Sequence, residues 1–126
     1  MMYGKGYQQY KENSIDTMTQ GELLLTLFDE LMKRLMRAEL ALEKQDYAAM
    51  EEAVDRSSAI IRYLSGTLDR SYEISGNLYR LYDYFLYELA RVRAGRNKTS
   101  LETVKRMIGE LRDTFRIAAQ NNDSGK

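Results

Sequence analysis

The sequence predicts an all-α protein, an antiparallel up-down four-helix bundle with an extended N-terminal arm. Four stretches repeat apolar residues at alternating steps of three and four, which places them along one face of an α-helix. The 126 residues include no proline and only eight glycines, so a turn-rich β architecture is disfavoured. Short connections make successive helices antiparallel neighbours, and an up-down bundle is their simplest arrangement. A three-helix core with one helix exchanged into a dimer is the alternative.

Residues 1–17 form the predicted arm, because they carry three tyrosines and no helical period. A disordered terminus is the ordinary alternative, since chain ends are poorly ordered unless something ties them down. Tyr7 and Tyr10 favour docking of the arm, because large aromatic rings gain free energy when they leave water.

The first helix is expected to begin after Thr19 and to end near Lys44. The run from Thr19 to Glu22 fits a capping box, in which the hydroxyl accepts a hydrogen bond from one backbone amide and Glu22 reaches back to another. The apolar face of this helix is Leu24, Phe28, Leu31, Leu35, Ala38 and Leu42.

Asp46 is the expected cap of the second helix. The face of that helix is Tyr47, Met50, Val54, Ser57, Ile61, Leu64 and Leu68. After a short turn at residues 69–72, the third helix is expected over residues 73–94, with Gly95 as its C-cap. Its apolar face is Ile74, Leu78, Leu81, Phe85, Leu89 and Val92.

The fourth helix is expected to start at a second capping box, from Thr99 to Glu102. The bundle domain is therefore assigned to residues 18–120, and residues 121–126 are expected to form a polar, flexible tail. The apolar face of the fourth helix is Leu101, Val104, Ile108, Leu111, Phe115 and Ala118.

Composition narrows the possible functions. The chain has 19 basic and 19 acidic residues, so no net field attracts nucleic acid or an anionic membrane. No apolar run approaches the ~20 residues that span a bilayer, and no signal peptide pattern opens the chain, so a cytoplasmic protein is expected. A local basic cluster could serve nucleic acid or a protein partner, or simply complement a helix end. It consists of Arg91, Arg93, Arg96, Lys98, Lys105 and Arg106.

The chain contains no histidine and no cysteine, which argues against an enzyme, a metal site and a cofactor. Metal sites in helical bundles use Glu-x-x-His pairs, and these cannot form here. Glu88 lies nearest an apolar face and is interpreted as a flanking salt-bridge residue. Ser57 lies within the apolar face of the second helix, where it is interpreted as a small packing residue whose hydroxyl bonds a backbone carbonyl.

The first and third helices carry a second apolar stripe beyond the ~100° that a bundle helix needs. Three things could cover these stripes: the neighbouring helices, the N-terminal arm, or the helix of a partner. The last two can both apply, because an arm could shield the groove until a partner displaces it. Flexible methionine and amphipathic tyrosine suit a surface that repacks and is sometimes wet. We expect these stripes to form a partner-binding groove of Leu25, Met32, Met36, Tyr79, Tyr82 and Leu86.

Several short runs occur in a characteristic order. They are Tyr7-x-x-Tyr10, Ser14-Ile15-x-Thr17, Glu22-Leu23-Leu24-Leu25-x-Leu27-Phe28-Asp29, Asn77-Leu78-Tyr79-x-Leu81-Tyr82-Asp83-Tyr84 and Leu111-Arg112-Asp113-Thr114-Phe115. This order resembles the flagellar secretion chaperone family, FliS, over nearly the whole chain.

The resemblance implies a small cytoplasmic four-helix bundle that binds the disordered C-terminal segment of flagellin. Such a chaperone prevents premature polymerisation and delivers flagellin to the flagellar type III export gate. It also implies that Tyr7 and Tyr10 cap the groove and that Ile15 anchors the arm. An adaptor that binds a regulatory protein, such as an anti-sigma factor, or another secretion substrate is the alternative, because it would use the same groove.

Overall fold

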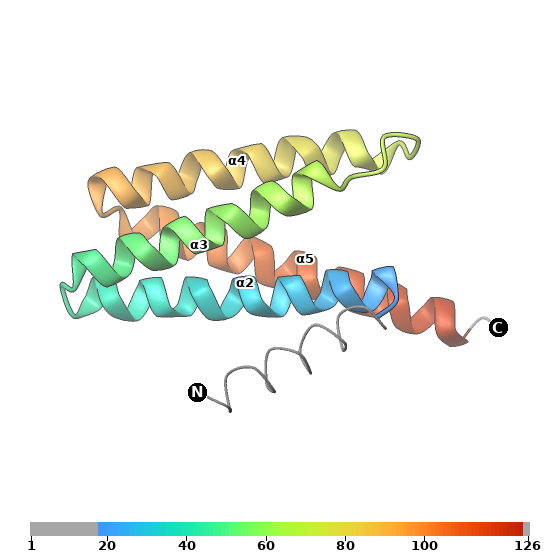
Figure 1. Cartoon of the computed structure of the whole chain (residues 1–126), viewed down its shortest axis with the longest axis horizontal. Helices are drawn as coiled ribbons and strands as arrows, with labels where there is room; N and C mark the ends of the chain where they lie inside the picture. Colours follow the sequence, from blue (N-terminus) through green and yellow to red (C-terminus); the bar gives the residue numbers. More distant parts are fainter. Residues whose placement is uncertain (1–17, 125–126) are drawn as a thin grey trace, which may run out of the picture.

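The computed structural model describes residues 18–124. Its order of elements is α2 (Gln20–Glu43), α3 (Tyr47–Gly66), α4 (Ile74–Gly95) and α5 (Lys98–Ser124) (Figure 1). The predicted all-α four-helix bundle is confirmed. The predicted arm, with Tyr7, Tyr10 and Ile15, lies outside the described residues.

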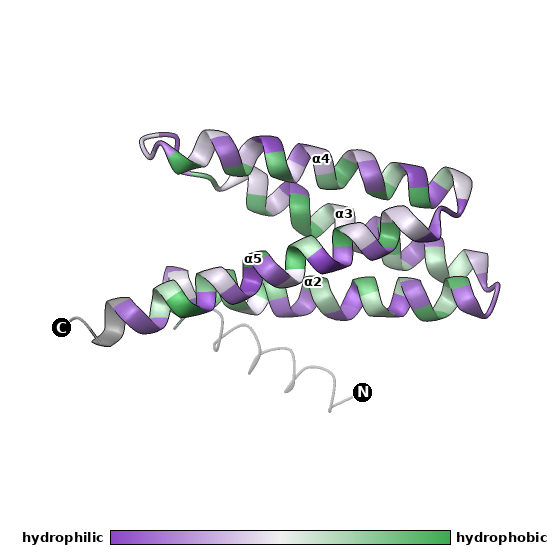
Figure 2. Ribbon diagram, turned by 180° about the vertical axis from the view of Figure 1, so that it is seen from behind, coloured by the Kyte–Doolittle hydropathy of each residue, from purple (hydrophilic) through white to green (hydrophobic). Residues whose placement is uncertain are grey.

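Each helix packs on two others, so the four form a closed ring of contacts. α2 packs against α3 and α5, and α4 packs against the same two helices, which places α2 and α4 diagonally across the bundle. The N-termini of α2 and α4 and the C-termini of α3 and α5 share one end of the molecule (Figure 1). Hydrophobic and hydrophilic segments alternate along the ribbons, as amphipathic helices require (Figure 2).

The predicted N-caps of α2 and α3 are confirmed. The side chain of Thr19 accepts a hydrogen bond from the backbone N–H of Glu22 at 3.1 Å, and the Asp46 carboxylate accepts one from Ala49 at 3.2 Å. In α5 the cap lies two residues earlier than predicted. Asn97, and not Thr99, accepts the bond from the Ser100 N–H, at 3.0 Å.

The ends of α4 and α5 also differ from the prediction. Gly95 is still helical, and the left-handed residue that ends α4 is Arg96, with φ of 55°. Its guanidinium carbon lies 3.4 Å from the centroid of the Tyr47 ring, a cation–π contact. α5 continues to Ser124, four residues beyond the predicted end of the bundle.

The core combines apolar faces from all four helices. Predicted face residues are fully buried on each helix, among them Phe28, Leu35, Met50, Ile61, Phe85, Leu89, Leu101 and Ile108. Two predictions are wrong. Ile74, the first residue of α4, is 58% exposed, whereas the next residue, Ser75, is buried. Ala118 is exposed, in the part of α5 near its C-terminus.

The two polar residues singled out in the sequence have structural roles. Ser57 is fully buried and donates a hydrogen bond to the carbonyl oxygen of Ala53 at 2.8 Å, as interpreted. Glu88 is 6% exposed and accepts a bond from Arg91 Nη1 at 3.2 Å, so it is a salt-bridge residue with most of its side chain buried.

Candidate functional site

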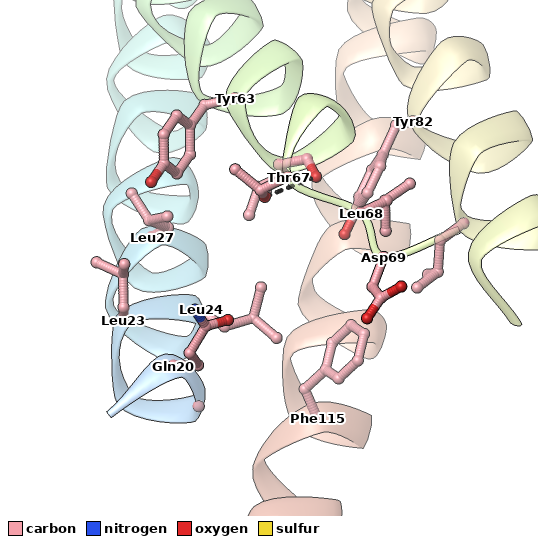
Figure 3. A pocket seen from close by; sticks show the side chains of 13 residues that line it. Gln20, Leu23, Leu24, Leu27, Tyr63, Thr67, Leu68, Asp69, Tyr82 and Phe115 are labelled. Atoms are coloured by element: carbon pink, nitrogen blue, oxygen red, sulfur yellow. Dashed lines mark hydrogen bonds between the residues drawn. The ribbon is translucent and has the colours of Figure 1, made fainter. Parts of the chain in front are cut away.

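A hollow opens at the end of the bundle where α2 and α4 begin. Its volume is about 370 Å³, and all four helices and the α3–α4 connection line it. Figure 3 shows side chains from α2 on one side facing those from α4 and α5 on the other. The lining residues are Gln20, Gly21, Leu23, Leu24, Leu27, Tyr63, Leu64, Thr67, Leu68, Asp69, Leu78, Tyr82 and Phe115.

The hollow exists because apolar side chains at this end meet no opposing layer within the described residues 18–124. Leu24, Leu27, Leu68 and Phe115 all border the core, yet each remains only partly buried. Leu68 belongs to the connection between α3 and α4, which bends away at the Asp69 turn. Large apolar side chains left half-exposed in one concave place are typical of a surface that another molecule covers.

Two polar groups mark the wall and the rim of this hollow. Tyr82 is only 2% exposed, and its hydroxyl is directed toward the hollow beside Leu68 (Figure 3). Burial raises the pKa of Tyr82 to about 12, so the hydroxyl keeps its proton. Asp69 accepts bonds from the Ser71 hydroxyl at 2.6 Å and the Ser71 N–H at 3.0 Å. These bonds lower the pKa of the Asp69 carboxyl, so it is charged near neutral pH.

A second concave surface lies on the other side of the first turns of α2, against α5. Gly21, Leu24 and Phe115 line both concave surfaces, so this part of α2 separates them. Asp29 holds the two helices together, since its Oδ1 lies 3.2 Å from Arg116 Nη2 and 3.8 Å from Arg112 Nη1. The other residues that line this second surface are Leu25, Ala118 and Ala119.

The three predicted groove residues of α2 lie toward α5 or on open surface. Leu25 lines the second concave surface. Met32 is partly buried, and its Cε lies 3.6 Å from where a β-carbon would stand at Gly109 of α5. Met36 is 50% exposed. The neighbouring helix α5 therefore covers part of this stripe, which was one of the three expected covers.

The three predicted groove residues of α4 occupy a different part of the bundle. Tyr79 and Leu86 lie fourteen and seven residues before Arg93, on the same helical stripe. Arg93 Nε bonds Asp55 of α3 at 2.8 Å, so this stripe follows the α3–α4 seam. Of the six predicted residues, Tyr82 alone lines the hollow of Figure 3, and the structure does not bring the six into one groove.

Five members of the predicted basic cluster pair with acidic side chains of the bundle, and the sixth, Arg96, contacts an aromatic ring. Arg93 pairs with Asp55, and Lys105 Nζ lies 3.0 Å from Glu39 Oε1 on α2. Arg96 stacks on an aromatic ring. The remaining three pair with acids three or four residues away on their own helices, as Arg91 with Glu88, Lys98 with Glu102 and Arg106 with Glu110. The cluster therefore favours the structural interpretation over nucleic-acid binding.

Two features are absent from the described residues 18–124. No group of three or more acidic, histidine or cysteine side chains is arranged there to hold a metal ion. None of the helices described there is both long enough and apolar enough to cross a membrane.

Comparison with known proteins identifies the family. The sequence model of the family described as Flagellar protein FliS matches residues 3–122. The chain belongs to the FliS family. Similar FliS relatives carry the name flagellar secretion chaperone, so an export chaperone role is the one that family membership supports.

Two FliS relatives show how much of the chain is shared. The flagellar secretion chaperone FliS of Bacillus subtilis is 30% identical over 115 residues, covering 91% of this chain and 86% of the relative. The Salmonella typhimurium chaperone of the same name is 29% identical over 116 residues, covering 89% and 86%. A crystal structure of a bacterial flagellar chaperone shares the fold, with a TM-score of 0.77 at 18% identity over 93% of this chain and 97% of that one.

Sequence reasoning missed most of the residues that make the hollow of this FliS family member. Leu23 and Leu27 were not assigned to a site, although the unbroken apolar run from Leu23 to Leu25 exceeds what one helical face requires. Tyr63 was also missed. It is 51% exposed on α3, and an aromatic residue three positions before the last residue of a helix gives no signal of its own.

Proposed function

We propose that this chain is a chaperone of the bacterial cytosol that binds the disordered C-terminal segment of flagellin, prevents its premature polymerisation and delivers it to the flagellar type III export gate. The observation that carries the proposal is the half-exposed apolar lining of the hollow between α2, α4 and α5. Membership of the FliS family supports flagellin as the substrate.

The physical mechanism is folding on binding. A disordered segment must spend part of its interaction free energy on becoming ordered, and burial of apolar surface offsets that cost. Leu23, Leu24 and Leu27 supply such surface on α2, and Leu68 and Phe115 supply it on the opposite side. A flagellin segment held here cannot use the same apolar surface to join a filament.

The N-terminal arm is the proposed regulator of this site. Residues 1–17 lead directly to Thr19 and Gln20, and Gln20 lines the hollow. We assign Tyr7 and Tyr10 as side chains that compete with flagellin, and Ile15 as their anchor. Tyr10→Ala is therefore expected to leave the affinity for flagellin unchanged or to raise it, because a competitor is removed.

Titration calorimetry of the full chain with a peptide of the host flagellin C-terminal segment tests the proposal. Circular dichroism of the same mixture is expected to show helix gained on binding. Leu23→Asp should weaken the affinity for the peptide by at least about tenfold, because it places a charge in an apolar site. Leu40→Asp is the matched control, since Leu40 is 54% exposed on α2 and does not line the hollow.

The proposal fails if the wild-type chain does not bind the peptide at tens of micromolar. The placement of the site fails if Leu23→Asp and Leu40→Asp bind equally well while both remain folded.

A further inference from the structure

The hydroxyl of Tyr82 is a polar group at the edge of an apolar hollow. The residue is 2% exposed, and Figure 3 shows its hydroxyl directed into the space between Leu68 and Phe115. Within residues 18–121 this hydroxyl makes no hydrogen bond, and desolvation is the sole cause of its raised pKa. No fully buried side-chain nitrogen or oxygen in that same part of the chain lacks a partner. The Tyr82 oxygen is therefore open to the hollow.

While the hollow is empty, water can bond to this hydroxyl, but an apolar occupant that displaces the water leaves the hydroxyl unpaired unless it supplies an acceptor. Removing a hydroxyl from water without a replacement hydrogen bond is costly, and most buried side-chain polar groups are paired for that reason. A phenylalanine at position 82 would fill the same wall without this cost. The tyrosine hydroxyl is therefore explained best by an acceptor that the occupant of the hollow supplies.

An acidic group in the lining restricts the chemistry of that acceptor. Asp69 lines the same hollow as the polar side chains of Gln20, Tyr63 and Thr67, and its carboxylate accepts a hydrogen bond from the Ser71 hydroxyl. A second carboxylate placed beside it would be repelled. The remaining lining is mainly leucine and aromatic side chains, and the volume of about 370 Å³ lies within the ~300–1,000 Å³ of ligand pockets.

We propose that the Tyr82 hydroxyl is a specificity-determining group, which donates a hydrogen bond to a neutral acceptor on an otherwise apolar partner segment. That acceptor is a backbone carbonyl or the side chain of Asn, Gln, Ser or Thr. The inference rests on the proposed function, because it takes the flagellin segment as the occupant. The chain's own residues 1–17 are the other candidate occupant, and the experiment separates the two.

Tyr82→Phe in the full chain is the test, because it removes one oxygen and keeps the ring. Calorimetry with the flagellin C-terminal peptide is expected to show about three- to tenfold weaker binding, the usual range for one neutral hydrogen bond. The urea midpoint of the free protein is expected to stay the same or to rise. Tyr84→Phe is the matched control on the same helix. Tyr84 is 39% exposed and does not line the hollow, so the Tyr84→Phe variant should bind the peptide with the affinity of the wild type.

Three results would overturn the inference. Equal affinity of Tyr82→Phe and wild type means that the partner does not use the hydroxyl. Tighter binding by Tyr82→Phe means that the hydroxyl holds residues 1–17 against the partner. A wild-type chain that binds no peptide refutes the proposed function itself, and the inference falls with it.

Discussion

The rings of Phe28 and Phe115 stack, with centroids 5.5 Å apart and planes 29° from parallel. Phe28 is fully buried in α2, whereas Phe115 is partly exposed on α5 and lines both concave surfaces beside α2. One aromatic pair therefore connects the core to the site. We expect Phe28 to contribute mainly to folding, and Phe115 to contribute both to folding and to the shape of the hollow.

Alanine substitution of these two rings is expected to separate stability from binding. Phe28→Ala should cost about 3–5 kcal/mol of unfolding free energy, the usual cost of a fully buried phenylalanine. Phe115→Ala should cost about 1–3 kcal/mol of unfolding free energy, because the ring is already partly in water. It should also weaken the affinity for the flagellin peptide by more than about tenfold. Urea unfolding measures the free energy of unfolding, and calorimetry measures the affinity for the peptide. Equal destabilisation by both substitutions would contradict the assigned burial.

Gly109 offers a stabilising substitution away from the hollow of Figure 3. It lies within α5, where glycine is less favourable than alanine by about 0.8–1.0 kcal/mol. A β-carbon there would meet Met32 Cε at 3.6 Å and Sδ at 3.9 Å, which are ordinary van der Waals contacts. Gly109→Ala is therefore expected to raise the free energy of unfolding by about 1 kcal/mol, with peptide affinity unchanged. A lower urea midpoint would show that Met32 cannot accommodate the methyl group.

The sequence predicts the N-caps of α2 and α3 better than it predicts the end of α4. The caps at Thr19 and Asp46 depend on a side chain and an amide three residues apart, so the information is local. The end of α4 is different, because Arg96 at that end contacts Tyr47 at the start of α3, which is far from it in the sequence. No local pattern reveals that contact, and Gly95 was the reasonable but wrong choice for the left-handed position.

The contact between Arg96 and Tyr47 makes a prediction that a double mutant tests. Arg96→Gly relieves a left-handed conformation that costs about 1–2 kcal/mol, but it loses a cation–π contact worth about 0.5–1 kcal/mol at an exposed site. The single substitution is therefore expected to be neutral or slightly stabilising. In a Tyr47→Leu background the same substitution should stabilise by about 1 kcal/mol or more. Urea unfolding of the four proteins measures the coupling, and additive effects would show that the stacking contributes nothing.

The candidate site was only partly predictable for a different reason. A helical period identifies which face of a helix is apolar, but it does not say which neighbour covers that face. Leu25 and Met32 lie toward α5 and Met36 is exposed, whereas the stripe of Tyr79 and Leu86 follows the seam with α3. Tyr82 is buried and lines the hollow, and its role in partner binding stays a prediction.

Asp69 provides a prediction about pH at the rim of the hollow. The Ser71 hydroxyl, and then the Ser71 N–H, lower the carboxyl pKa below the ordinary 3.8. A lowered pKa in the folded state means that the hydrogen-bonded carboxylate stabilises the turn above pH 3.8, and that this contribution is lost as the pH falls through the lowered value. Carbon-13 NMR of the Asp69 carboxyl should therefore show a midpoint below 3.8 in the wild type. Ser71→Ala should move that midpoint upward, because the side-chain bond is the larger cause, while the remaining N–H bond keeps part of the effect. An unchanged midpoint in Ser71→Ala would show that the Ser71 hydroxyl does not stabilise the Asp69 carboxylate.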